Sequence, residues 1–488
     1  MANTTGEIRF LLGDEERALS GVPPTLTILQ YLRRHERLTG TKEGCAEGDC
    51  GACTVMLAEP DGAGGLRRWS VNACIQFVPS LHGRQLTTVE HLAAPDGALN
   101  PVQQAMVDHH GSQCGFCTPG FVMQLETGRM TGEMAETGLI DWLAGNLCRC
   151  TGYGPIIAAG RQVMAEAGNN DADADRAVAE RLKGLAGKST LALAHDGQAW
   201  FAPRDEDQLA AIYAEHPDAV LVAGATDVGL WVTKQHRRLD TLIDVTRVAE
   251  LHELRDDGTV LNIGAAVSHR AATAALANLH GDLAELLRRF ASIQIRNSGT
   301  VGGNIANGSP IGDLPPALIA LDARLHLRKG DARRDMALED FFIDYGKQDR
   351  APGEFVTRVE VPHLPADAQF GCYKLSKRFD QDISAVMAAF RVTVGDGVAR
   401  DARIAFGGMA ATPKRAAEAE AALTGKPWTE ATVEAACAAL DRDYAPITDM
   451  RASAAYRATV AAGLLRRFYL ERTGAGLARL GEVEAAHG

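Results

Sequence analysis

The hydrophobic and polar positions along the chain predict successive regions of different architecture. Residues 1–90 predict a small mixed domain, because short apolar strands at Ile8–Leu12, Thr54–Ala58 and Trp69–Ala73 accompany one amphipathic helix. The Pro-Pro-Thr segment before that helix makes Thr25 its expected cap.

The next region, residues 91–167, has the apolar periodicity of helices that can pack as a four-helix bundle. The expected helices are Pro101–His110, Thr118–Thr127, Ala135–Ala144 and Pro155–Glu166. Residues 168–190 begin as a polar, acidic stretch without aromatic residues. This composition predicts an interdomain linker with a helical second half.

Strands and helices alternate over residues 191–366, which predicts an α+β domain. The expected strands are Val220–Ala223, Thr241–Asp244 and Val260–Gly264, and the expected helices are Glu206–Glu215 and Ala271–Leu279. Residues 367–475 differ, because a hairpin around Asp396 and Gly397 precedes three alanine-rich helices. Residues 476–488 are expected to form a tail.

Composition narrows the class of protein. A chain of 488 residues allows about three domains, and its net charge of −12 argues against a nucleic-acid-binding surface. The sequence has no apolar run of about 18 residues, and its first residues, MANTTGEIRF, do not form a signal peptide. We therefore expect a cytoplasmic protein. Eight of the ten cysteines lie between Cys45 and Cys150, and in a reducing compartment such clusters favour metal or redox chemistry.

The first four cysteines have the spacing Cys-x4-Cys-x2-Cys with a distant fourth member. They are Cys45, Cys50, Cys53 and Cys74. This spacing is typical of plant-type [2Fe–2S] ligands, and the glycines in GCAEGDCGAC suit a loop wrapped around a cluster. A zinc site is the alternative, although zinc sites prefer paired Cys-x2-Cys knuckles and this set has one such pair.

Four further cysteines form a second set. Cys114 and Cys117 lie in QCGFCTPG, and Cys148 and Cys150 lie in NLCRCTGY. Alone this set could hold zinc, but beside a plant-type set a second [2Fe–2S] cluster is favoured. Cys372 and Cys437 have no partner set, so we expect them to be buried apolar residues.

The motifs GCAEGDCGAC, QCGFCTPG and NLCRCTGY, in this order, resemble the iron–sulfur half of the molybdenum hydroxylases. That family includes xanthine dehydrogenase, aldehyde oxidase and carbon monoxide dehydrogenase. The resemblance implies a multidomain α+β fold with a β-grasp ferredoxin-like domain, a four-helix [2Fe–2S] bundle, an α+β FAD-binding domain and a small C-terminal α+β domain. It also implies that the second cluster lies nearer the molybdenum cofactor, with Gln113 facing that cofactor on another chain.

Two glycine-rich segments, Leu221–Gly229 and Asn297–Asp313, have the composition of loops pressed against phosphates and sugar. The first lacks the Walker A ending and the Rossmann spacing, so alone it could equally be an ordinary strand–loop–helix connection. At this separation the two segments resemble the FAD domain of the same family.

That resemblance assigns the expected flavin contacts. The diphosphate would be lined by Leu221, Val222, Ala223, Gly224, Ala225, Thr226, Asp227 and Val228, and the remaining contacts would come from Phe290, Thr300, Gly303, Asn304, Asp313, Val356 and Lys374. Phe290 would lie against the flavin, although a core aromatic is the commoner role. Thr300, Gly303 and Asn304 would surround the phosphates. Asp313 would reach a polar group of the cofactor, Val356 would contribute its backbone, and Lys374 would begin the last contact segment.

The resemblance is nearest to the small subunits of bacterial xanthine dehydrogenases. It implies an oxidoreductase that passes electrons from purine hydroxylation to urate, on a molybdenum-cofactor-binding large subunit, through two [2Fe–2S] clusters and FAD to NAD+. The partners would form a heterotetramer with two copies of each chain, and no substrate-activating residue is assigned to this chain. The alternatives are the same architecture serving aldehyde, carbon monoxide or N-heterocycle oxidation, a stand-alone iron–sulfur flavoprotein, or a scaffold with structural zinc. NAD+ has no fingerprint of its own in the sequence.

Overall fold

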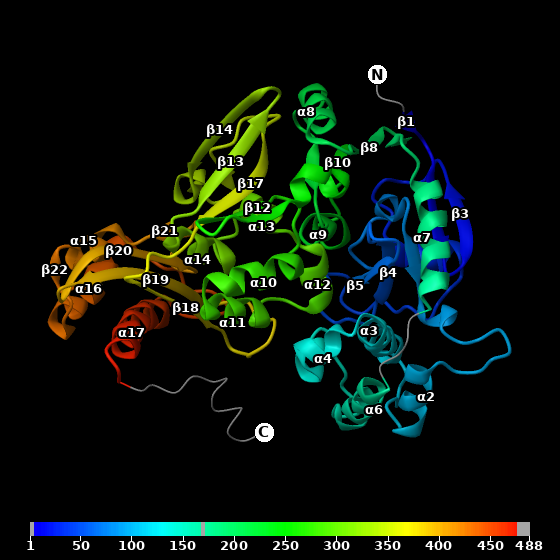
Figure 1. The fold of residues 1–488 in the computed structure, drawn as a ribbon, viewed down its shortest axis with the longest axis horizontal. Helices are drawn as coiled ribbons and strands as arrows, with labels where there is room; N and C mark the ends of the chain where they lie inside the picture. The colour runs from blue at the N-terminus through cyan, green and yellow to red at the C-terminus, as the bar shows by residue number, and fades with distance from the viewer. Residues whose placement is uncertain (1–3, 167–170, 476–488) are drawn as a thin grey trace.

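The computed structural model describes residues 4–166 and 171–475. The first strands (blue) and the helical domain (cyan) lie on one side of a central domain (green to yellow), and the C-terminal domain (orange and red) lies on the other (Figure 1). Residues 168–170 of the expected linker and the expected tail, 476–488, lie outside the described residues. None of the described helices combines the length and the apolar character needed to cross a membrane.

The N-terminal domain is a five-stranded mixed sheet with the order β3-β2-β6-β4-β5. Its strands are β2 (Ile8–Leu12), β3 (Glu15–Leu19), β4 (Thr54–Pro60), β5 (Leu66–Asn72) and β6 (Gln85–Thr87). β2 and β6 are parallel, and the other neighbours are antiparallel. The short helix α1 (Ile28–Gln30) and the π-helical turn Tyr31–His35 bury Leu29 and Leu32 in the same core.

The helix cap is Thr27, so the expectation for Thr25 is wrong. Thr27 Oγ1 accepts a hydrogen bond from the Gln30 backbone N–H at 3.1 Å, and the Gln30 side chain accepts one from the Thr27 N–H at 3.3 Å. This reciprocal pair is a capping box, in which the third helical residue satisfies the cap's own N–H. The glutamine three residues after Thr27 was the signal in the sequence.

The helical domain contains five helices. They are α2 (Pro101–Asp108), α3 (Thr118–Thr131), α4 (Glu133–Thr137), α5 (Leu139–Leu143) and α6 (Gly154–Ala165). The helix expected over Ala135–Ala144 is divided in two at Gly138, whose φ of +87° cannot continue a right-handed helix. α3 lies at the centre, with every residue from Gly120 to Gly128 buried.

The stretch expected to be a linker is mostly helix. α7 (Ala172–Ala186) begins at the cap Asp171 and packs Leu182 and Leu185 against Leu11 of the N-terminal sheet. In Figure 1 it runs along the front of β4. An ion pair between Arg68 and Asp175, whose side chains are 8% and 16% exposed, ties it to β5. This segment is therefore an integral part of the N-terminal domain.

The central domain has two five-stranded sheets. The first has the order β1-β7-β8-β10-β9, built from β1 (Thr4–Thr5), β7 (Thr190–His195), β8 (Gln198–Ala202), β9 (Val220–Val222) and β10 (Thr241–Asp244). β1 is the N-terminal segment of the described chain, and it pairs in parallel with β7. The second sheet is antiparallel, with the order β11-β12-β17-β13-β14 and the strands β11 (Leu254–Asp256), β12 (Val260–Gly264), β13 (Arg324–Lys329), β14 (Ala332–Ala337) and β17 (Phe355–Pro362).

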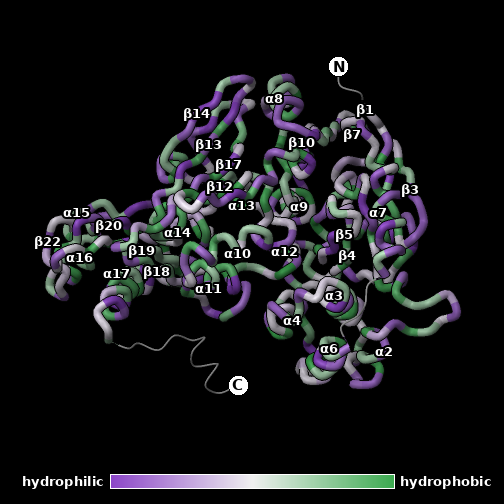
Figure 2. Tube along the Cα trace, viewed as in Figure 1, coloured by the Kyte–Doolittle hydropathy of each residue, from purple (hydrophilic) through white to green (hydrophobic). Residues whose placement is uncertain are grey.

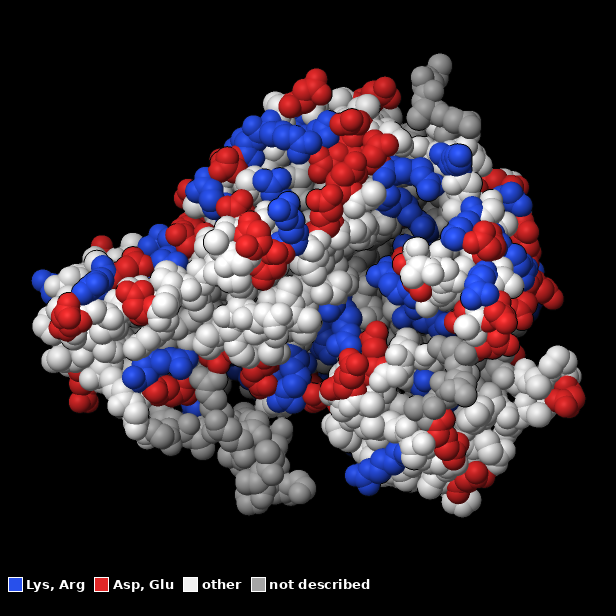
Figure 3. Space-filling model, in the orientation of Figure 1, with Lys and Arg blue, Asp and Glu red and all other residues white. Residues whose placement is uncertain are grey.

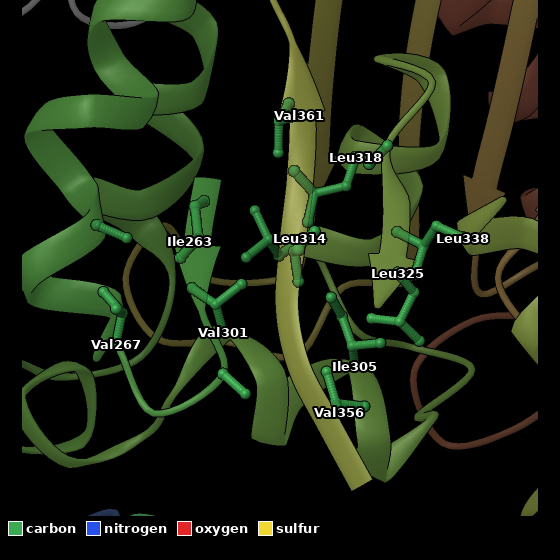
Figure 4. Packing of buried hydrophobic residues seen from close by; sticks show 14 of the residues in the cluster. Ile263, Val267, Val301, Ile305, Leu314, Leu318, Leu325, Leu338, Val356 and Val361 are labelled. Atoms are coloured by element: carbon green, nitrogen blue, oxygen red, sulfur yellow. The ribbon is translucent and has the colours of Figure 1, made fainter. Parts of the chain in front are cut away.

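Helices pack around and between these sheets. They are α8 (Glu206–Glu215), α9 (Val228–Thr233), α10 (His269–Leu279), α11 (Gly281–Arg289), α12 (Ile293–Ser298), α13 (Val301–Asn307) and α14 (Leu314–Ala320). Figure 4 shows Val301 and Ile305 of α13 packed beside β17, next to Leu314 of α14. The outer strand β14, at the rim of the molecule, is mostly hydrophilic (Figure 2), as its exposed residues require.

The C-terminal domain is an antiparallel sheet with the order β18-β19-β20-β21, backed by helices. Its elements are β18 (Ala368–Leu375), β19 (Val386–Gly395), β20 (Val398–Gly407), β21 (Lys414–Arg415), β22 (Lys426–Pro427), α15 (Ala417–Leu423), α16 (Glu430–Asp443) and α17 (Ala454–Arg472). The β19–β20 hairpin turns at Asp396 and Gly397, both with positive φ, as the sequence predicts.

Candidate functional site

The four cysteines of the first set face one another at one end of the N-terminal sheet. The Cys45 thiol contacts those of Cys50 and Cys74, and the Cys74 thiol contacts that of Cys53. The backbone N–H groups of Glu47 and Asp49 lie 3.5 and 3.3 Å from Cys45 Sγ. Because backbone N–H groups stabilise negative charge on sulfur, this loop fits an anionic cluster.

The second set assembles between α3 and the turn before α6. Cys114 contacts Cys150, and Cys117 contacts Cys148. The sulfur of Cys148 also lies 3.1 Å from the hydroxyl of Thr151. Two pairs of thiols at one place suit a cluster of two irons. Cys372 and Cys437 are both buried, away from these sets.

The two cysteine loops touch each other. The backbone N–H of Leu147, next to Cys148, donates to the carbonyl of Cys50 at 3.0 Å. A Cβ on Gly51 would lie 2.3 Å from the carbonyl oxygen of Gly145, so the approach requires glycine.

The two glycine-rich segments of the central domain lie side by side, which the sequence alone could not establish. A Cβ on Gly224 would lie 1.8 Å from the carbonyl oxygen of Ser298, and one on Gly303 would lie 3.7 Å from the Cβ of Ala223. Thr300 caps α13, accepting a hydrogen bond from the Gly303 N–H at 3.0 Å. The buried amide oxygen of Asn304 has no hydrogen-bond partner among the described residues. The two closely packed loops and the unpaired buried oxygen of Asn304 therefore fit a polar ligand such as a dinucleotide, which could donate a hydrogen bond to that oxygen.

Asp313 and Lys374 form a buried ion pair at the junction of the central and C-terminal domains. Lys374 Nζ lies 2.6 Å from Asp313 Oδ2 and 2.8 Å from the hydroxyl of Ser384. Ser384 donates to the other oxygen of Asp313 at 2.5 Å. Ser384 was missed by the sequence reasoning because it is ten residues after Lys374 in a segment that reads as an ordinary strand entrance.

The remaining predicted flavin residues are less closely grouped. Phe290 is half-buried, and its ring packs against His269 at a centroid distance of 4.8 Å. Burial lowers the pKa of His269 to about 3, so this imidazole is neutral at neutral pH. Val356 lies in the core near Ile305 (Figure 4), which leaves only its backbone to face a ligand. Burial raises the pKa of Asp227, beside the start of α9.

The first cysteine loop also abuts the β9–α9 segment. Gln76, two residues after Cys74, donates through Nε2 to the carbonyl of Gly224 at 2.7 Å. The Lys234 ammonium donates to the carbonyl of Cys45 at 3.0 Å. The structure thus joins the second thiol set to the first, and the first to the glycine-rich loop.

Four domain models match the chain in succession. They are a 2Fe-2S iron-sulfur cluster binding domain over residues 12–78, a [2Fe-2S] binding domain over 88–161, the FAD binding domain in molybdopterin dehydrogenase over 193–364, and the CO dehydrogenase flavoprotein C-terminal domain over 371–472. These matches confirm the expected fold class and the cofactor complement of two [2Fe–2S] clusters and FAD.

Individual proteins extend this similarity. The chain is 34% identical to a xanthine dehydrogenase of Drosophila subobscura over 84% of its own length, and 32% identical to aldehyde oxidase 2 of Cavia porcellus over 92%. It spans only 35% and 38% of those relatives. A solved carbon monoxide dehydrogenase chain from Hydrogenophaga pseudoflava is 29% identical, with a TM-score of 0.52, over 55% of this chain and 94% of that one. The chain therefore belongs to the molybdenum hydroxylase family and carries the iron–sulfur and FAD-binding domains of that family of oxidoreductases.

Proposed function

We propose that this chain is the electron-transfer subunit of a xanthine dehydrogenase. Hypoxanthine and xanthine would be hydroxylated on a partner chain that holds the molybdenum cofactor, and NAD+ would be the final acceptor. Hydroxylation of a purine carbon by water releases two electrons and two protons, and NAD+ takes up both electrons and one proton. When bound, [2Fe–2S] clusters carry electrons singly, and FAD converts them into hydride transfer.

The observation that supports this proposal is that the three sites touch one another in succession: the second thiol set contacts the first, and the first contacts the glycine-rich loop. The hydrogen bond from Leu147 to Cys50 joins the loops of the two thiol sets, and the hydrogen bond from Gln76 to Gly224 joins the first set to the glycine-rich loop. We propose the cluster ligands and flavin contacts that the sequence predicts, with Ser384 added as the residue that orients Lys374 and Asp313.

The partner would dock where the second thiol set reaches the surface. Cys114 and Cys150 are exposed, and so is Gln113. Two large apolar side chains beside them, Phe116 and Leu147, are 46% and 48% exposed. The face of the helical domain seen in Figure 3 carries wide uncharged areas. Exposed apolar groups around a redox centre suit a protein interface, since burial there would also exclude water from the thiolates.

A second candidate is the same architecture serving an aldehyde or N-heterocycle oxidase. The aldehyde oxidase relative, 32% identical over 92% of this chain, supports it almost as well as the xanthine dehydrogenase relative does. Electron-transfer domains do not select the organic substrate, because the substrate would bind on the partner.

The deciding experiment expresses the full chain, isolates the large subunit that co-purifies with it, and measures NADH formation from xanthine and NAD+. We expect NADH in proportion to the urate formed. A complex with intact clusters and flavin that oxidises aldehydes or quinoline-like heterocycles but not xanthine would overturn the purine assignment. Oxidation of xanthine with oxygen but not NAD+ as acceptor would overturn the NAD+ assignment.

A further inference from the structure

Three buried polar side chains from three domains meet where the two cysteine loops touch. They are Thr54 at the start of β4, Asn146 in the loop after α5, and Gln294 in α12. Their exposed fractions are 1%, 2% and 0%. We call these three residues the interdomain amide network.

Hydrogen bonds join the three side chains to one another and to one backbone carbonyl. Gln294 Nε2 donates to Asn146 Oδ1 at 2.8 Å and to Thr54 Oγ1 at 3.2 Å. Asn146 Nδ2 donates to the carbonyl of Gly51 at 3.0 Å, and the Thr54 hydroxyl donates to the same carbonyl at 2.6 Å. One carbonyl of the first cysteine loop thus receives hydrogen bonds that fix it to the helical domain and, through Gln294, to the central domain.

The position of the network along the chain is specific to the cysteine loops. Thr54 directly follows Cys53, Asn146 lies two residues before Cys148, and Gly51 lies between Cys50 and Cys53. A Cβ on Gly145 would lie 2.2 Å from Gln294 Oε1, and one on Gly120 would lie 2.2 Å from the carbonyl of Gly51. Glycines on both sides therefore let the loops close onto these three side chains.

Stability alone does not account for this arrangement. Gln294 Oε1 is buried without a hydrogen-bond partner among the described residues, which costs free energy that an apolar side chain of similar size would not. The hydrogen bonds of a buried polar network are directional, however, so they specify one relative placement of the elements that they join. Apolar packing specifies that placement less strictly.

We propose that the interdomain amide network is a positioning device that sets the separation of the two [2Fe–2S] clusters, with Gln294 as its positioning residue. The inference rests on the proposed electron-transfer function. Gln294 touches neither set of thiols in any described hydrogen bond; it acts through Thr54 and Asn146. Both of these residues donate to the carbonyl of Gly51, in the loop that carries Cys50 and Cys53, and Asn146 lies two residues before Cys148.

The test measures the magnetic interaction between the two clusters in the full chain, reduced with dithionite, by electron paramagnetic resonance. Gln294→Met keeps the size of the side chain and removes both donors. Thr54→Val removes the hydroxyl, and Thr54→Ser keeps it. Gln198→Leu is the matched control, because Gln198 is a buried glutamine that donates to Leu239 O at 2.7 Å within the central domain.

We expect every variant to keep two clusters with unchanged individual signals and reduction potentials. Gln294→Met and Thr54→Val should lose the splitting that arises from cluster–cluster interaction, whereas Thr54→Ser and Gln198→Leu should keep it. Splitting retained in both Gln294→Met and Thr54→Val, or lost in Gln198→Leu as well, would overturn the proposal. If Gln294→Met does not fold, the Thr54→Val and Thr54→Ser pair decides. Because the measurement uses no purine, NAD+ or partner, its result is independent of whether the xanthine assignment holds.

Discussion

Removal of the Lys374 ammonium should destabilise the junction of the central and C-terminal domains. The loss of stability should exceed that caused by removing an exposed lysine from a surface ion pair. In Lys374→Met, Asp313 keeps its hydrogen bond from Ser384 and loses the cation 2.6 Å away. The two side chains of the pair are 3% and 5% exposed, so water cannot replace the lost charge. Breaking a buried pair on one side costs about 3–5 kcal/mol.

The double variant Lys374→Met/Asp313→Asn should cost less than the single one. It leaves no unpaired charge, only a buried amide with incomplete hydrogen bonding, which costs about 1–3 kcal/mol. The single variant should therefore cost about 2 kcal/mol more than the double variant. Lys183→Met is the matched control, because Lys183 and its partner Glu180 are 48% and 64% exposed, and such a pair contributes about 0.5 kcal/mol or less.

Amide hydrogen exchange of β18 and β19 in the flavin-free chain is the suitable assay. It reports the free energy of local opening at the strands that carry Lys374 and follow Ser384, without assuming that a multidomain chain unfolds in one step. A single variant no less stable than the double variant would refute the reasoning, because the cost would then come from lost packing rather than from an isolated charge.

Three further outcomes are expected. Gly224→Ala should lower the flavin content, measured by absorption, and should destabilise the central domain by more than about 1–3 kcal/mol, measured by thermal unfolding, because its Cβ would lie 1.8 Å from a backbone carbonyl oxygen. The control Gly281→Ala should change neither quantity, because a Cβ at that position has nothing within 4 Å. Cys114→Ser should lose one cluster and half of the iron, whereas Cys437→Ser should keep both, as iron analysis and electron paramagnetic resonance would show. Because the pKa of His269 is lowered to about 3 in the folded chain, the unfolded chain takes up the proton first as pH falls below about 6.5. Stability should therefore decline with falling pH, by up to about 1.4 kcal/mol per pH unit, and urea unfolding at pH 7 and 5 should show a smaller decline in His269→Phe.

The parts of the site that the sequence predicts are those set by local spacing. Each thiol set depends on short intervals, such as the two residues between Cys114 and Cys117, together with loops whose glycines appear in the motif itself. The β19–β20 hairpin is similar, because Asp396 and Gly397 determine the turn without help from other elements.

What the sequence could not show depends on contacts between distant segments. Gln294 bonds to Thr54 across 240 positions, and a single buried glutamine has no pattern that reveals such a partner. The helix α7 reads as a polar spacer because its apolar side consists of few residues, and only the N-terminal sheet beside it explains why they are buried. The division of the helix expected over Ala135–Ala144 has a local cause. The positive φ of Gly138 interrupts a segment whose periodicity otherwise predicts one helix.

The short strand β1 affects how the protein can fold during its synthesis. Thr4 and Thr5 are translated long before their parallel partners in β7, which begin at Thr190. At about 5–20 residues per second, the wait is about 10–40 s, long enough for the N-terminal sheet and the helical domain to fold first. Thr4 and Thr5 cannot make this pairing before β7 is available, so the first sheet of the central domain is completed by a strand that was translated before any other part of that sheet.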